Sequence, residues 1–259
     1  MKQESILYVC GSRGSRTVCG ARFEEFGGYT TCYLLRRGDE AVLVDCGTGL
    51  YNASPLLRGC SRVDILLTHL HYDHLLGLLD WSVFPPQVQP TFYSTFSDWD
   101  CDPLQFCRPP FWPVKPGAHV LQNVSTGEEI SLGANVRAEF YKSGHPNEAN
   151  IVILHTEQSK ITILCDYEHG FPVPDAAADC DLLIYDGMFD DTTYPAHRGW
   201  GHSTWQQACR CARKLGAKKL LVTHHAPDSS DDQLLAWEKE AQKLFPQTHF
   251  ARMKQKLQV

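Results

Sequence analysis

Short apolar runs separated by polar and glycine-containing turns dominate this chain, and their length and β-branched content predict strands. In the first half of the chain, the predicted strands span residues 6–9, 31–35, 41–44 and 63–67. A second set spans residues 128–132, 136–141, 150–155, 160–165, 181–185 and 219–223. The pattern therefore predicts a chain built of two strand-rich halves.

Helical periodicity appears in fewer places, at residues 203–215 and 231–244, with a shorter helix beginning at 75–79. Ser203 can cap the first of these helices, and Ala208 and Leu215 fall on its apolar face. Two sheets packed face to face, with helices on both outer sides, account for this order of elements. We therefore expect an α/β fold with four layers, αββα, whose strands end along one edge.

Residues 81–118 differ in composition from the rest of the chain, because they combine nine aromatic residues with eight prolines. Prolines disfavour regular structure, so these aromatic side chains must pack on a neighbour or line a pocket. Two interpretations stay open: a satellite hydrophobic cluster, or a lid-like substrate wall in which Phe111 and Trp112 contact the substrate. A nucleobase stacked on such side chains gains ~1–3 kcal/mol.

Four metal-binding side chains occur within six residues, at His69, His71, Asp73 and His74, directly after the apolar run 63–67. Imidazoles and carboxylates are ligands that borderline cations such as zinc prefer. His69 and His71 can face the same way, whereas Asp73 and His74 lie further along the loop. The cluster therefore predicts a site for two metals rather than one.

The H-x-H-x-D-H spacing resembles that of the metallo-β-lactamase superfamily, and His145, Asp166 and His224 follow it in the order that this superfamily shows. The resemblance implies the metallo-β-lactamase sandwich with a dimetal site at one edge. It implies these donors: His69, His71 and His145 for one metal, Asp73, His74 and His224 for the other, and Asp166 as the bridge.

The segment Gly201-His202-Ser203-Thr204, followed by a helix, narrows the resemblance to one branch of the superfamily. It looks like the His-Ser-Thr element of the tRNA 3′-endonuclease RNase Z and its small phosphodiesterase relatives. Residues 11–15, 27–32 and 186–195 also resemble that phosphodiesterase branch, although glycine-rich turns of this kind occur in many folds. The resemblance implies hydrolysis of phosphodiesters, and relatives that are commonly homodimers.

The expected chemistry uses two divalent ions about 3.5–4 Å apart, which can hold an attacking hydroxide and grip a phosphoryl oxygen. Zn²⁺ suits a histidine-rich donor set, with Mn²⁺ as the alternative. We expect Asp73 to orient the hydroxide and His202 to contact the substrate and assist the leaving oxygen, since imidazole titrates near neutral pH. Without its Gly-His-Ser-Thr context, His202 would be interpreted as an ordinary residue at a helix start.

His224 and His225 both follow the predicted strand 219–223, so either could be the last ligand. Alternation of side chains along a strand points only one of them inward. The resemblance selects His224, and His225 stays as the alternative.

The bulk composition predicts one domain over residues 1–259, since 43% hydrophobic content in a chain of this length can bury a full core. The resemblance implies that this domain is a hydrolase. No apolar run reaches eighteen residues and the N-terminus lacks the features of a signal peptide, which predicts a cytoplasmic protein with no membrane partner. Eleven cysteines without a Cys-x-x-Cys pair indicate reduced thiols. An extra metal at Cys101 and Cys107, or at Cys209 and Cys211, is the alternative.

A net charge of −6 without a large basic block argues against a long nucleic acid as substrate. The leading hypothesis is therefore a dimetal phosphodiesterase acting on small cyclic phosphodiesters, in particular 3′,5′-cyclic mononucleotides. The alternatives are tRNA 3′-end processing, hydrolysis of a 1,2-cyclic ribose phosphate, and a metal-scaffolded nucleotide-binding protein without turnover.

Overall fold

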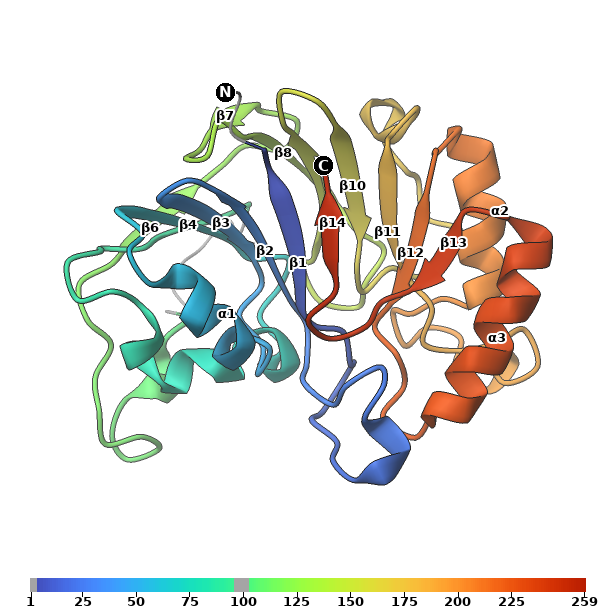
Figure 1. Cartoon of the computed structure of the whole chain (residues 1–259), viewed down its shortest axis with the longest axis horizontal. Coiled ribbons are helices and arrows are strands. Elements are labelled where there is room, and N and C mark those ends of the chain that lie inside the picture. Colours follow the sequence, from blue (N-terminus) through green and yellow to red (C-terminus); the bar gives the residue numbers. More distant parts are fainter. Residues whose placement is uncertain (1–3, 96–102) are drawn as a thin grey trace.

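The computed structural model describes residues 4–95 and 103–259, which form two sheets packed face to face (Figure 1). The first sheet has the strand order β14-β1-β2-β3-β4-β5-β6. Its strands are β1 (Ile6–Gly11), β2 (Cys32–Arg37), β3 (Glu40–Val44), β4 (Arg62–Leu66), β5 (Thr91–Ser94), β6 (Val120–Asn123) and β14 (Lys256–Gln258). Strands β3 to β6 are parallel, whereas β1 pairs antiparallel with both β2 and β14.

The second sheet has the strand order β13-β12-β11-β10-β9-β8-β7. Its strands are β7 (Ile130–Ser131), β8 (Arg137–Lys142), β9 (Asn150–His155), β10 (Lys160–Leu164), β11 (Leu182–Asp186), β12 (Leu220–Thr223) and β13 (Thr248–Phe250). Strands β10 to β13 are parallel, and β7 to β10 alternate in direction. Parallel strands end at the same edge of a sheet, so both sheets can deliver loop residues to one place.

Helices cover the outer faces of the two sheets, α1 (Leu50–Leu57) on the first and α2 (Trp205–Leu215) with α3 (Asp231–Leu244) on the second (Figure 1). One apolar core fills the space between the sheets, and two more lie beneath the helices. This arrangement confirms the predicted αββα layers. Among the described residues, no helix combines the length and the hydrophobicity that a membrane span needs.

The N-terminus of α2 differs by one residue from the prediction, because Thr204 rather than Ser203 is the cap. The Thr204 hydroxyl accepts from the Gln207 amide at 3.0 Å, and the Gln207 side chain accepts from the Thr204 amide at 2.8 Å. The Ser203 hydroxyl instead donates to the Tyr167 carbonyl oxygen. This reciprocal capping box fixes where the helix begins, with the cap Thr204 two residues after His202.

Residues 81–118 contain more regular structure than their prolines led us to expect. Strand β5 begins directly after Pro90 and pairs with β4, with Thr91 opposite Asp64. A proline just before a strand removes no donor from the ladder, so it does not prevent pairing. The part of the predicted lid at 96–102, which includes Cys101, lies outside the described residues.

Three polar residues turn the chain sharply where strands end. Asp45 follows β3, Asp166 follows β10 and His224 follows β12, with φ angles of 60°, 53° and 57°. Only a few per cent of non-glycine residues adopt this left-handed conformation, and it costs about 1–3 kcal/mol where the surroundings impose it. Such backbone is concentrated at functional sites, and all three residues lie around one cluster of polar side chains.

Candidate metal centre

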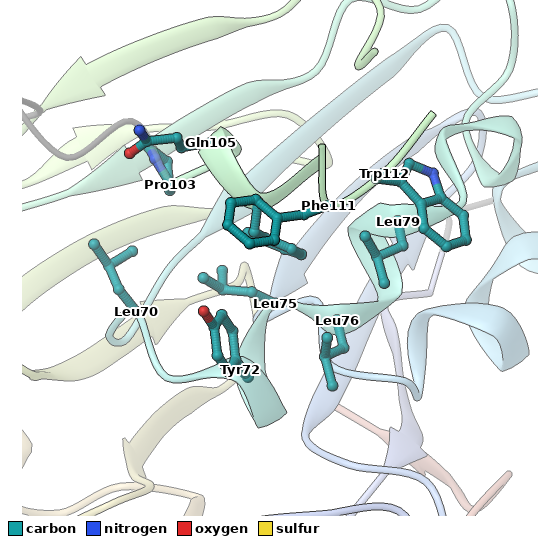
Figure 2. A pocket seen from close by; sticks show the side chains of 10 residues that line it. Leu70, Tyr72, Leu75, Leu76, Leu79, Pro103, Gln105, Phe111 and Trp112 are labelled. Atoms are coloured by element: carbon teal, nitrogen blue, oxygen red, sulfur yellow. The ribbon is translucent and has the colours of Figure 1, made fainter. Parts of the chain in front are cut away.

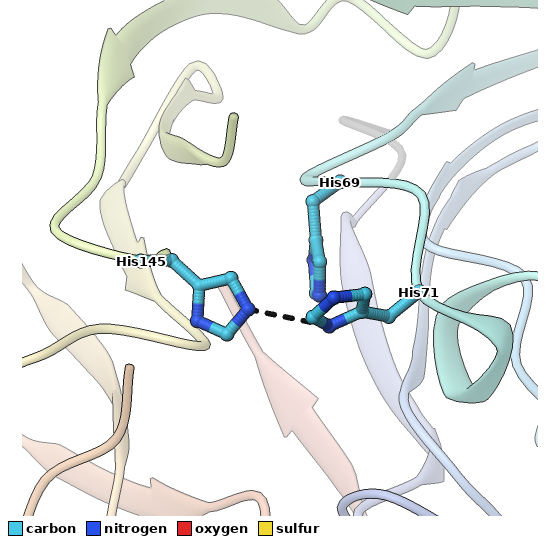
Figure 3. A group of neighbouring side chains, drawn as sticks. All are labelled: His69, His71 and His145. Carbon is cyan, nitrogen blue, oxygen red and sulfur yellow. Dashed lines mark hydrogen bonds between the residues drawn. The ribbon is translucent and has the colours of Figure 1, made fainter. Parts of the chain in front are cut away.

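Three histidines form one group of possible ligands, with His69 and His71 in the loop after β4 and His145 in the loop after β8 (Figure 3). One ring nitrogen from each lies within 4.8 Å of the others. Nε2 of His145 is 3.2 Å from Nδ1 of His71, and Figure 3 shows these two rings pointing toward each other. The structure thus brings together three residues that the sequence grouped on one metal.

A second group joins Asp73 and His74, from the short helix η2 (Tyr72–His74), with His224 after β12. Nε2 of His224 lies 3.3 Å from Oδ2 of Asp73, and Nε2 of His74 lies 3.5 Å from the same oxygen. All three side chains are buried. The group matches the donor set expected for the second metal.

Asp166 lies between the two groups. Its Oδ1 is 3.8 Å from Nε2 of His69, whereas its Oδ2 is 2.9 Å from Nε2 of His74 and 3.2 Å from Nε2 of His224. One carboxylate therefore reaches donors of both groups, which is the geometry that a bridging ligand requires.

Two features of this centre fit a bound divalent cation. Nε2 of His69 is buried without a hydrogen-bond partner, which is costly for a polar atom unless a ligand satisfies it. Burial lowers the pKa of His69, His71 and His145, so these rings stay neutral and keep a lone pair for a metal.

The local charge also favours a cation. Burial works to lower the pKa of His74, but the carboxylates of Asp166, Asp45 and Asp73 outweigh it and raise that pKa. The same buried carboxylates that would hold a proton on an imidazole would attract a divalent ion. The chain therefore presents a site for a divalent metal whose donors combine histidine nitrogens with aspartate carboxylates.

Neighbouring groups orient these donors. His74 donates through Nδ1 to Oδ2 of Asp45 at 2.7 Å, and Asp45 accepts the amide and hydroxyl of Thr68, each at 2.8 Å. The Ser15 amide donates to Oδ2 of Asp73 at 2.7 Å. Such contacts fix the tautomer and the ring orientation of a ligand. Sequence reasoning missed Asp45, although Asp45, like Asp166, directly follows a predicted strand.

His202 lies beside this centre and pairs with Asp186, another residue absent from the predicted site. Its Nδ1 donates to Oδ2 of Asp186 at 2.8 Å and lies 3.7 Å from Oδ1 of Asp166. Burial works to lower the pKa of His202, but the Asp186 carboxylate outweighs it and raises that pKa to about 9. The ring of His202 stacks on that of His224, with centroids 4.9 Å apart.

His225 has a different environment from its neighbour His224. Its Nε2 donates to the Ala251 carbonyl oxygen at 2.9 Å, and its ring stacks on Phe250 at 5.7 Å. Burial lowers its pKa to about 3, so the ring is neutral in the core. The structure therefore places His224 near the other candidate donors and His225 in the hydrophobic interior. Alternation along a strand predicted that the two side chains would point to different sides, and the resemblance selected His224 as the ligand.

An apolar cavity of about 710 Å³ opens next to the histidine loop (Figure 2). Its lining is Leu70, Tyr72, Leu75, Leu76, Leu79, Pro103, Gln105, Phe106, Phe111 and Trp112. Leu70 and Tyr72 flank His71 in the chain, so one wall of the cavity belongs to the loop of the metal centre. Phe111 projects over this space in Figure 2 and is 77% exposed.

Cysteines contribute nothing to the metal-binding groups of the described residues. Cys209 and Cys211 lie on the buried face of α2, where each packs as a small apolar side chain. Cys107 is also buried, and its proposed companion Cys101 lies outside the described residues. The alternative of an extra metal on Cys209 and Cys211 gains no support.

Histidine and aspartate donors at the strand ends of an αββα sandwich define a class of metal-dependent proteins. Residues 40–225 match the family described as the Beta-lactamase superfamily domain, and the chain belongs to this superfamily. The match spans the first histidine cluster, Asp166 and His224, so it covers every donor of the candidate centre.

The chain is also related to ribonuclease Z proteins. It is 41% identical to Ribonuclease Z of Gemmatimonas aurantiaca, over 84% of this chain and 86% of that protein. It is 24% identical to Ribonuclease Z 2, mitochondrial, of Schizosaccharomyces pombe, over 75% of this chain. The chain covers only 31% of the length of that second relative.

Solved structures share the fold across the whole chain. The metallo-β-lactamase fold protein YhfI from Bacillus subtilis superposes with a TM-score of 0.78 at 20% identity, covering 100% of both chains. A diphosphatase from the PhnP family superposes with a TM-score of 0.73 at 20% identity, covering 98% of each. These structures establish the metallo-β-lactamase architecture of the chain.

Proposed function

We propose that the protein is a metal-dependent hydrolase of phosphodiester bonds. The observation that carries the proposal is Asp166, whose carboxylate reaches His69 on one side and His74 with His224 on the other. Relatives named ribonuclease Z, and a structural neighbour named a PhnP-family diphosphatase, support phosphoester chemistry. We assign two divalent ions to the site, Zn²⁺ first and Mn²⁺ as the alternative, held by His69, His71, His145, Asp73, His74, His224 and the bridging Asp166.

Bound divalent ions supply two effects here, since they lower the pKa of water and polarise a phosphoryl oxygen. The chain's own residues then divide the remaining work. The Ser15 amide fixes Asp73 through Oδ2, so that this carboxylate can orient the attacking water. Nδ1 of His202 donates a hydrogen bond to Asp186. Nε2 is therefore the ring atom that can donate a proton to the leaving oxygen.

Within this class we propose 3′,5′-cyclic mononucleotides as substrates. The apolar cavity is lined by the chain neighbours of His71 and presents the rings of Tyr72, Phe111 and Trp112, on which a nucleobase can stack. Its volume of about 710 Å³ accommodates a nucleoside-sized group. The net charge of −6 favours a small ligand over a polyanion.

The decisive experiment incubates the pure protein with Zn²⁺ or Mn²⁺ and a panel of cyclic nucleotides, a 1,2-cyclic ribose phosphate and a precursor tRNA. We expect ring opening of at least one 3′,5′-cyclic mononucleotide. A preference for the cyclic ribose phosphate would replace the proposed substrate but keep the chemistry. Retention of nucleotide without turnover of any compound would replace the enzyme with a metal-scaffolded binding protein.

tRNA 3′-end processing is the second candidate, and the relative from Gemmatimonas aurantiaca favours it. It requires a cationic surface outside the metal centre, so binding of precursor tRNA should weaken steeply with salt. A linear fall of log affinity with log salt concentration, together with cleavage at the 3′ end, would establish it.

Two further properties belong to the proposal. We propose that the protein assembles as a homodimer and functions in the cytoplasm. Light scattering after size-exclusion chromatography would test the assembly, and a monomer at working concentrations would exclude it.

A further inference from the structure

Glu168 is a buried carboxylate that accepts several hydrogen bonds from one loop. It accepts the Gly201 amide at 2.8 Å, the Gly199 amide at 3.1 Å and the Tyr194 hydroxyl. Glu168 is 8% exposed. Hydrogen bonds to an ionised acceptor are about twice as strong as those between neutral groups, so Glu168 holds residues 194–201 firmly.

The backbone around Glu168 joins this loop to the metal centre. Glu168 lies two residues after Asp166, and its own amide donates to the Gly144 carbonyl oxygen at 3.1 Å, next to His145. Glu168 therefore lies in the segment of the bridging aspartate and contacts both the loop of His145 and the loop that leads into His202.

Gly201 is the element through which Glu168 can act. Its amide donates to Glu168, while its carbonyl oxygen accepts Nδ1 of His145 at 3.2 Å, and the next residue is His202. Its φ is +87°, and a Cβ at this position would lie 2.0 Å from Nδ1 of His145. The peptide is thus packed directly against one metal-binding histidine, so a shift of Gly201 moves both His145 and His202.

We propose that Glu168 is a positioning residue, which holds Gly201 so that its carbonyl orients His145 for metal and His202 stays against Asp186. The part that concerns metal affinity is independent of the proposed reaction. The part that concerns His202 rests on the proposed function, because it requires a leaving oxygen to assist.

The test compares two substitutions of Glu168, one that changes the length of the side chain and one that removes its charge. Glu168→Asp keeps the charge but shortens the side chain, so it cannot span Tyr194 and Gly201 together. Glu168→Gln keeps the length: its oxygen can accept the Gly199 and Gly201 amides, and its amide can donate to the Tyr194 oxygen. Tyr194→Phe is the matched control, because it removes one donor and leaves the Gly201 contact.

The first readout is metal affinity, measured by competition between each purified variant and a chelator for Zn²⁺. We expect Glu168→Asp to bind Zn²⁺ about 10- to 100-fold more weakly than wild type, as is typical when the partner of a ligand histidine is disturbed. Glu168→Gln and Tyr194→Phe should stay within about threefold. Equal affinity in all four proteins, with native thermal melting, would overturn the proposal.

The second readout is a double-mutant cycle with His202→Ala, at saturating metal. If Glu168 acts through His202, Glu168→Asp should lower turnover by about tenfold in the wild-type background and hardly at all in the His202→Ala background. Fully additive losses would remove His202 from the proposal. If no cyclic diester is turned over by the wild type, the metal competition alone still decides whether Glu168 positions His145.

Discussion

His224 and His225 are adjacent in the chain, yet one lies among carboxylates and the other between Phe250 and the Ala251 carbonyl. We expect His224→Ala to lose metal, because it removes a donor next to Asp166. His225→Ala should keep the metal and lower the free energy of unfolding by about 1–3 kcal/mol, since it removes a buried ring. Elemental analysis and denaturant titration of both variants provide the check, and an exchange of the two outcomes would exchange the roles.

His202 allows a sharper test at the residue scale. His202→Ala should retain metal and bind substrate nearly normally, yet lose on the order of a hundredfold in turnover, because Nε2 no longer serves the leaving oxygen. A nitrophenyl phosphodiester has a better leaving group, so the substitution should lower its turnover much less. Steady-state kinetics on both substrates measure the contrast, and equal losses would exclude leaving-group assistance.

The sequence indicated the candidate metal ligands better than the residues that hydrogen-bond to the site histidines. His69, His71, Asp73 and His74 stand out because four donors fall within six residues. Asp45 and Asp186 are single aspartates at strand ends, and such residues commonly cap turns. Only the folded chain, which brings distant strand ends together, shows that they orient His74 and His202.

On the scale of the elements, the aromatic segment 81–118 allows a test of whether the cavity binds substrate. We expect Phe111→Ala to raise KM more than it lowers kcat, because stacking on a base stabilises the ground state and the transition state about equally. Phe111 is 77% exposed, so its removal should cost little stability. Kinetics and thermal melting decide the point together, since a large fall in melting temperature with unchanged kinetics would assign Phe111 to packing.

Helix α3 is fastened to β13 by Glu238, which accepts the Phe250 amide at 2.7 Å and pairs with Arg252. Burial works to raise the pKa of Glu238, but the hydrogen bonds from Arg252 and Phe250 outweigh it and lower that pKa below 4.5. The stabilisation of the fold by ionised Glu238 is therefore complete above pH 4.5, and it is lost as the pH falls through the lowered pKa of Glu238 in the folded protein.

We expect Glu238→Gln to lower the free energy of unfolding by about 1–3 kcal/mol at neutral pH, with the difference from wild type shrinking in acid. Glu240→Gln is the matched control on the same helix, because Glu240 is exposed and forms an ion pair with Lys243 at the surface. Urea titrations across pH measure both. A constant difference down to pH 3 would contradict the assignment.

Element boundaries followed from the sequence wherever apolar runs were long. The strand at 150–155 and the helix at 231–244 match the structure to the residue. Strands β5, β6, β13 and β14 were not predicted, since each has only three or four residues and owes its existence to pairing with a distant neighbour. Helix α1 was also missed, because Pro55 interrupts its pattern.

At the scale of the whole molecule, the donors come from both sheets, so a bound metal should hold the two sheets together. Zn²⁺ at about 100 times its Kd should stabilise the fold by ~2.7 kcal/mol, or on the order of 5–10 °C in Tm. Calorimetry with and without EDTA provides the measurement. Asp166→Ala should abolish most of this shift, and an unchanged Tm in the wild type would argue against metal binding by the folded chain.

The αββα arrangement was predicted from two sets of strands and the amphipathic helices at 203–215 and 231–244, and the superfamily match bears it out, although α1, which covers the first sheet, was missed. The path of the last residues was not predictable. Nothing in the composition of 256–258 shows that this segment crosses back to the sheet of the first half, where it pairs with β1. The expectation of one domain over residues 1–259 stays a prediction.

The return of β14 to β1 has a consequence for the order of events during synthesis. Ribosomes release the chain from its N-terminus, so β1 emerges long before Lys256–Gln258 and stands with an open edge until these residues follow. His224 also emerges 155 residues after His69. A nascent chain therefore displays the His69–His74 cluster well before the opposing donors exist, and we expect full metal loading only after His224 has been synthesised.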